Sequence, residues 1–205
     1  MDIVLASRNK KKIQELKMIM ESSGIAAGES VNILTADSFE NCGEVIEDGL
    51  TFEENAMKKA LEIAACSGLT AVADDSGLEV DALDGAPGVY SARYAGEGAD
   101  DDANFRKLLT AMKNTPESSR GARFVCCIAV AVKGKVMTFR GHVEGVIGNS
   151  PRGENGFGYD PIFFPEGHDR TFAEMSDMEK HAMSHRGRAL EALLQAIKEG
   201  TLSLH

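Results

Sequence analysis

The fold is decided by residues 51–77, TFEENAMKKALEIAACSGLTAVADDSG, in which a capped helix leads directly into a short apolar strand. Thr51 and Glu54 have the spacing of a capping box, and Gly68 suits the C-terminal cap of the same helix. Apolar residues recur between them at helical spacing: Met57, Ala60, Leu61 and Ala64. Residues 70–73, TAVA, predict a buried strand that ends at Ala73, directly before Asp74.

The same alternation continues on both sides of this unit. Short strands are predicted over residues 2–6, 31–36 and 161–164, and long strands over 122–132 and 136–147, joined in a hairpin at KGK. Further helices are predicted after Asn9, over 101–114 and over 176–197. Strands that alternate with helices, together with one long hairpin, predict an α/β fold with a mixed sheet.

Composition limits the classes of function. The 205 residues suffice for one domain or two small lobes, and 22 basic against 32 acidic residues give a net charge of −10. This charge argues against nucleic-acid or membrane-surface binding but allows a local cationic pocket. No signal peptide and no membrane-spanning run is found. The four cysteines form no CxxC pair, so we expect buried, reduced thiols in a cytoplasmic protein.

Charge is unevenly distributed along the chain. Residues 18–57 hold nine acids and no Lys or Arg, residues 60–92 hold six more acids and again no Lys or Arg, and both ends are basic. Folding can therefore gather both signs around one ligand, and a metal-bound polyphosphate needs both. The alternative is that most of these charges simply lie on solvated faces.

The opening turn, SRNKKK at residues 7–12, follows a strand and begins a helix. Free backbone N–H groups at such a helix start bind anions, Ser7 and Asn9 add hydrogen bonds, and Lys12 adds a movable charge. The alternative is a solvated basic turn that frays.

Two adjacent carboxylates, Asp74 and Asp75, follow the strand at the end where open α/β sheets bind ligands. Hard oxygen ligands of this kind suit Mg²⁺, although an Asx-turn with Gly77 at its bend is the structural alternative. Glu44 and Glu47 lie in a second acidic group, and spacing alone does not choose between them as a further metal ligand.

Two C-terminal segments are candidates for base and phosphate contacts. Phe157, held by a glycine-rich loop, can stack on a base, and Asp160 is fixed in an extended conformation before a proline. Phe163 or Phe164 is expected in the core. Lys180 and Arg186 have the character of phosphate or purine contacts. His181 and His185 have helical spacing, but no third zinc ligand is evident.

Together these segments resemble the inosine/xanthosine triphosphate pyrophosphatase family over almost the whole chain, from SRNKKK to SHRGRAL. The resemblance implies that the opening turn holds the triphosphate: Ser7, Arg8, Asn9, Lys10, Lys11 and Lys12. It implies Glu47 and Asp75 as ligands of Mg²⁺, Asp75 as the proton acceptor and Ser76 as a substrate contact. Which of Asp74 and Asp75 is the base stays open from the residues alone.

The resemblance also implies the contacts to the purine. FGYD supplies Phe157, Gly158, Tyr159 and Asp160, and the tail motif supplies Lys180, His185 and Arg186. The family's usual glycine before GFGYD is Asn155 here, a departure that can alter the loop. The family fold is elongated and two-lobed around a long central mixed sheet flanked by helices. We therefore expect one domain over residues 1–205 with the active-site cleft between two lobes, and a homodimer.

The activity that the resemblance implies is hydrolysis of ITP, dITP and XTP to the monophosphate and pyrophosphate. One alternative is a pyrophosphatase for other modified nucleotides, such as altered pyrimidine triphosphates. A second is a non-catalytic module that senses nucleotides, in which Glu47 and Asp75 would be superfluous.

Overall fold

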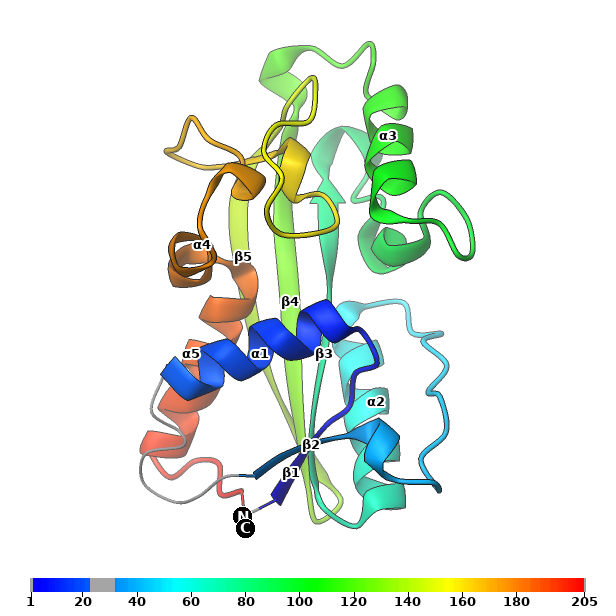
Figure 1. Ribbon diagram of the computed structural model, residues 1–205, viewed down its shortest axis with the longest axis vertical. Coiled ribbons are helices and arrows are strands. Elements are labelled where there is room, and N and C mark those ends of the chain that lie inside the picture. The colour runs from blue at the N-terminus through cyan, green and yellow to red at the C-terminus, as the bar shows by residue number, and fades with distance from the viewer. Residues whose placement is uncertain (1, 23–31, 205) are drawn as a thin grey trace. The chain divides into compact units, whose positions relative to one another are not determined.

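The computed structural model describes residues 2–22 and 32–204 (Figure 1). Its sheet has the strand order β2-β1-β3-β4-β5-β6. The strands are β1 Asp2–Leu5, β2 Asn32–Thr35, β3 Thr70–Val80, β4 Gly121–Val132, β5 Lys135–Ile147 and β6 Phe163–Pro165. The helices are α1 Lys10–Ser22, α2 Phe52–Ser67, α3 Asp101–Ala111, α4 Asp177–Met183 and α5 His185–Lys198. Because β1 pairs in parallel with β2 and β3 whereas β5 pairs antiparallel with β6, the predicted α/β fold with a mixed sheet is confirmed.

The chain divides into two compact units, and each has an apolar core. Unit 1 comprises Met1–Asp75, Cys126–Gly141 and Arg186–His205, and unit 2 comprises Ser76–Val125 and His142–His185. In unit 1, α1 and α5 pack with the strands through Ile3, Leu16, Ile128, Leu190 and Leu193. In unit 2, α3 and the later strands pack through Leu78, Leu108, Phe124, Phe163 and Phe172. Phe163 is thus the expected core residue.

Local signals in the sequence set the ends of several elements. Thr51 Oγ1 accepts the backbone N–H of Glu54 at 3.1 Å, and Gly68 ends α2 with φ 72°. The Glu54 carboxylate accepts from the N–H of Leu50, one residue before the cap, so only one half of the predicted capping box forms. Lys133 and Gly134, with φ values of 49° and 78°, form the turn of the predicted hairpin.

Four predictions are corrected. Asp160 is not extended before Pro161 but begins a short 3₁₀-helix, Asp160–Ile162, in which its carboxylate accepts the backbone N–H of Phe157. β3 continues from Thr70 to Val80 instead of ending at Ala73, so Asp74 and Asp75 lie within a strand and not in an Asx-turn. The closing helix is two helices, α4 and α5, separated by Ser184 with ψ 156°. The strand predicted over 31–36 is β2 followed by a short 3₁₀-helix from Ala36, and residue 31 is outside the described part of the chain.

The prediction that all four cysteines are reduced is also partly wrong. Cys42 and Cys66 form a disulfide in unit 1, with Cα atoms 5.4 Å apart, whereas Cys126 and Cys127 are free and buried, as expected. Spacing along the chain did not indicate this pair, because the loop that carries Cys42 returns to the end of α2 only in the folded protein. None of the helices in residues 2–22 and 32–204 is long and apolar enough to cross a membrane.

Candidate active site

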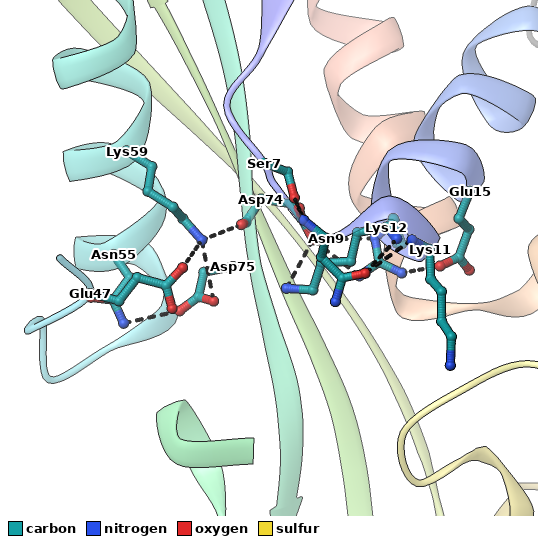
Figure 2. Close-up of polar contacts among 11 residues, drawn as sticks. Ser7, Asn9, Lys11, Lys12, Glu15, Glu47, Asn55, Lys59, Asp74 and Asp75 are labelled. Carbon is teal, nitrogen blue, oxygen red and sulfur yellow. Dashed lines mark hydrogen bonds and ion pairs between the residues drawn. The ribbon is translucent and has the colours of Figure 1, made fainter. Parts of the chain in front are cut away.

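The first turn of α1 is closed by its own cap (Figure 2). Asn9 Oδ1 accepts the backbone N–H groups of Lys11 and Lys12 at 3.0 and 3.2 Å, and Ser7 Oγ accepts the N–H of Asn9 at 3.3 Å. The predicted cap at Asn9 is therefore confirmed. Two of the N–H groups that the sequence offered to an anion are engaged by Asn9, so anion binding at this turn depends more on the side chains of Lys10, Lys11 and Lys12.

Four charged side chains of unit 1 contact one another beside α1. Lys12 and Glu15 come from α1, Asp74 from β3 and Arg186 from α5. Lys12 Nζ lies 3.6 Å and Arg186 Nη2 3.0 Å from Asp74 Oδ2, and Arg186 Nη1 contacts Glu15 Oε2. The Arg186 and Asp74 side chains are 1% and 0% exposed, so this is a buried, charge-balanced group.

A second group in unit 1 surrounds Lys59 of α2, as Figure 2 shows. Lys59 Nζ lies 2.7 Å from Glu47 Oε1, 2.7 Å from the backbone carbonyl oxygen of Asp74 and 3.6 Å from Asp75 Oδ1. Asn55 Nδ2 donates to Asp75 Oδ2 at 3.0 Å, and Asn55 Oδ1 accepts the N–H of Gly49 at 2.8 Å. Asn55 thus fixes Asp75 and the loop that carries Glu47 at the same time.

The two adjacent aspartates have opposite electrostatic environments. Burial raises the pKa of Asp74, but the positive charges of Lys12, Arg186 and Lys59 outweigh burial and hold that pKa far below its usual range. Burial also raises the pKa of Asp75, and the attraction of Lys59 and Lys12 does not reverse the shift. Asp74 is therefore a fixed countercharge, whereas Asp75 is the better proton acceptor.

Glu47 and Glu44 separate in the structure. The Glu44 side chain is 83% exposed and lies 4.0 Å from Arg8, which also contacts Asp37 at 3.4 Å. Glu47 instead joins the group around Lys59. The structure therefore favours Glu47 over Glu44 as the partner of Asp75, and it directs Arg8 toward an acidic loop of unit 1.

Unit 2 contains a separate polar group. Asp160 Oδ2 accepts the backbone N–H of Phe157 at 2.8 Å and Lys180 Nζ at 2.7 Å. The Lys180 ammonium also lies 4.8 Å from the centre of the Phe157 ring. The side chains of Asp160 and Lys180 are 3% and 5% exposed, so this pair is buried beside a partly exposed aromatic ring.

The other residues implied in base recognition are placed as follows. Tyr159 is buried, and its hydroxyl donates to the carbonyl of Ser91 at 2.9 Å, so it anchors the loop to which Gly158 belongs. The His185 ring stacks on Phe124 with centroids 4.8 Å apart. Ser76 lies within β3 and is partly exposed. Arg186, in contrast, belongs to unit 1, where Glu15 and Asp74 engage its guanidinium.

Sequence reasoning missed Glu15, Asn55 and Lys59. A signal was present, because Glu15 lies three residues after Lys12 and Lys59 lies four residues after Asn55, so each pair shares one face of its helix. Polar residues that recur beside an apolar helical stripe mark positions that can be buried with partners.

The oxygen atoms around Lys59 fit a hard divalent cation such as Mg²⁺. Carboxylates of Glu47 and Asp75 and the carbonyl of Asp74 already surround one positive charge. In the described part of the chain no three His, Cys, Asp or Glu side chains gather into a metal site. Mg²⁺ uses one or two protein carboxylates and completes its shell with waters and substrate oxygens, so Glu47 and Asp75 are the side chains that could hold such an ion.

Fold and site together define an α/β protein whose central strand carries paired carboxylates among lysines. The profile of the Ham1 family matches residues 3–196, and the chain belongs to this family. It is 51% identical over 192 residues to the dITP/XTP pyrophosphatase of Geobacter sulfurreducens, with 93% of this chain and 94% of that protein covered. The corresponding protein of Nocardia farcinica is 50% identical over 196 residues, covering 95% and 94%.

A solved structure agrees with this assignment. The HAM1 protein of Coxiella burnetii superposes with a TM-score of 0.87 at 42% identity and covers 97% of this chain and 99% of its own. The family resemblance inferred from the motifs is therefore confirmed.

Proposed function

We propose that this chain hydrolyses ITP, dITP and XTP to the monophosphate and pyrophosphate. Relatives about half identical to it over nearly their full length are named dITP/XTP pyrophosphatases. The observation that carries the proposal is in unit 1, where Glu47 and Asp75 surround a cation position while Lys12 lies beside Asp74. Acidic and basic groups are thus gathered as a metal-bound triphosphate requires.

In the proposed reaction, a water oxygen bonds to the α-phosphorus, the bond from that phosphorus to the bridging oxygen breaks, and pyrophosphate leaves. Asp75 accepts the proton of the water, since burial raises its pKa. Asp74 is a poor acceptor because Lys12 and Arg186 stabilise its ionised form against the effect of burial. These environments support Asp75 as the base.

The remaining groups of unit 1 bind and orient the triphosphate. Mg²⁺ bound at Glu47 and Asp75 would neutralise charge on the leaving phosphates. Lys12 and the other residues of the turn 7–12 would hold the phosphate oxygens by charge-assisted hydrogen bonds. Asp74 keeps Lys12 at this place, and Asn55 holds the Asp75 carboxylate in one orientation.

Unit 2 supplies the proposed contacts to the base. The Phe157 ring offers a stacking surface, and Lys180, held by Asp160, offers a buried donor to the 6-oxo group of hypoxanthine or xanthine. Adenine presents a donor at that position, and an unmatched buried donor can reject it by up to roughly 10⁴-fold. The family resemblance implies that the chain forms a homodimer in the cytoplasm, and we propose this for it.

The test is a substrate panel with Mg²⁺: ITP, XTP, dITP, GTP and modified pyrimidine triphosphates, with pyrophosphate measured as the product. We expect the deaminated purines to be hydrolysed fastest, and higher rates on the pyrimidines would support the alternative substrate class. Asp75→Asn should lose turnover but keep ITP binding. Asp48→Asn, a surface carboxylate paired with Lys58, is the matched control that keeps activity. ITP binding without pyrophosphate release by the unmodified chain would support the sensor instead.

A further inference from the structure

The Lys59 ammonium is surrounded by oxygen atoms of the kind that bind a metal ion. Its three oxygen neighbours come from the loop before α2 and from β3, and two of the three distances are 2.7 Å. The Lys59 side chain is 9% exposed. Two carboxylates and one backbone carbonyl oxygen face its Nζ, so the ammonium is paired with negative charge inside the protein.

One oxygen shell does not hold both cations. Mg²⁺ requires oxygens at about 2.0–2.1 Å, shorter than the 2.7 Å that these oxygens keep from the ammonium. A metal ion bound beside the ammonium would also be repelled by it. Even at the dielectric constant of water, the repulsion between a divalent and a univalent ion about 4 Å apart weakens metal affinity by roughly 30-fold.

We propose that Lys59 is an internal competitor for the catalytic metal: its ammonium fills the position between Glu47 and Asp75 until a metal displaces it. The inference rests on the proposed function, which assigns these two carboxylates to Mg²⁺. Displacement is possible because the ammonium is carried by a flexible four-carbon chain from α2. A displaced ammonium needs an anion, so the metal binds weakly alone and more tightly with a triphosphate.

Contacts other than those of Lys59 also hold the segments that carry the oxygen shell. Asn55 holds both Asp75 and Gly49, and the disulfide from Cys42 to Cys66 ties the preceding loop to the end of α2. Removing the charge of Lys59 should therefore leave the carboxylates in place and lacking their resident cation. Such a variant should bind metal more tightly.

The test measures metal binding without nucleotide. Mn²⁺ is titrated into the protein and free Mn²⁺ is followed by its electron paramagnetic resonance signal, with Mg²⁺ as the competing ion. We expect Lys59→Met to bind Mn²⁺ roughly 30-fold more tightly than the unmodified chain. Lys58→Met is the matched control, because Lys58 is the next residue of α2 and pairs with Asp48 at 2.6 Å outside the shell. It should bind as the unmodified chain does.

Two further variants locate the effect. Glu47→Gln added to Lys59→Met should return the affinity to the weak value, and Lys59→Gln should reproduce the gain if Lys59→Met does not fold by circular dichroism. Equal or weaker Mn²⁺ binding by a folded Lys59 variant would overturn the proposal. ITP hydrolysis by the unmodified chain is measured separately, so its absence would refute the proposed function while the binding data still judge Lys59.

Discussion

Replacing Arg186 by methionine should destabilise unit 1 strongly. The substitution keeps a long apolar stem but leaves the buried Glu15 and Asp74 carboxylates, 4% and 0% exposed, without the cation that contacts both. Breaking a buried ion pair by removing one partner costs about 3–5 kcal/mol. For a chain of this size each kcal/mol lowers Tm by about 2–4 °C, so a decrease of about 6–20 °C is expected.

The effect of Arg186→Met on stability should depend on pH. In the intact protein the pKa of Asp74 is lower in the folded than in the unfolded chain. The ionised carboxylate therefore contributes fully to the free energy of unfolding above its unfolded-state pKa, and this contribution is lost as pH falls through its folded-state pKa. Without Arg186 the pKa of Asp74 rises toward the value that burial favours. Protonation then relieves the uncompensated charge, and the Tm difference between variant and unmodified chain should shrink as pH falls from 7.5 to 4.5.

The assay is thermal unfolding followed by circular dichroism at both pH values. Arg188→Met, an exposed position two residues further along α5, is the control and should shift Tm by less than about 2 °C. If Arg186→Met unfolds like the unmodified chain and only its preference for ITP over GTP changes, the reasoning from the buried ion group is refuted. Arg186 would then act at the purine, as the family resemblance implies.

Three further predictions concern the proposed catalysis. Lys12→Ala should raise KM for ITP about tenfold or more, by loss of a charge-assisted hydrogen bond, and an unchanged KM would contradict its phosphate role. Because burial raises the pKa of Asp75, kcat/KM should fall with decreasing pH at values above the ordinary Asp value of about 3.9, whereas a flat profile down to pH 4 would exclude it as the base. Gly156→Ala places a Cβ 2.1 Å from Asp160 Oδ2 at φ +74°, so KM should rise; Gly167→Ala, with φ +80° and no atom within 4 Å of its Cβ, controls for backbone strain.

Much of the local structure was readable from the sequence. Asn9 and Thr51 mark helix starts because their side chains accept backbone N–H groups of the first turn, and Gly68 marks a helix end because it adopts the left-handed conformation. Each of these signals acts within a few residues. The hairpin turn at Lys133 and Gly134 is equally local. Of the residues assigned to the site by motif, seven lie in the three polar groups: Lys12, Arg186, Glu47 and Asp75 in the two groups of unit 1, and Phe157, Asp160 and Lys180 in the group of unit 2.

The end of β3 was misjudged for a physical reason. Two adjacent aspartates are poor strand residues, and charged side chains are buried only with partners. Their partners are Lys12, Lys59 and Arg186, which lie far from them in the chain. The residues next to Asp74 do not indicate that these cations will contact it. The local sequence therefore predicts a strand that ends before Asp74, whereas β3 continues to Val80.

By itself, the sequence determined most of the helices and strands, the α/β class and the family, because caps, periodicity and motifs act over short spans. The tertiary structure alone decided which charges meet: Arg186 contacts Glu15 across 171 residues of chain, and Lys59 fills the oxygen shell between Glu47 and Asp75. Electrostatic pairing depends on distance in space and on burial, and neither is encoded in the spacing of the residues. The different roles of the two neighbouring aspartates follow from that pairing.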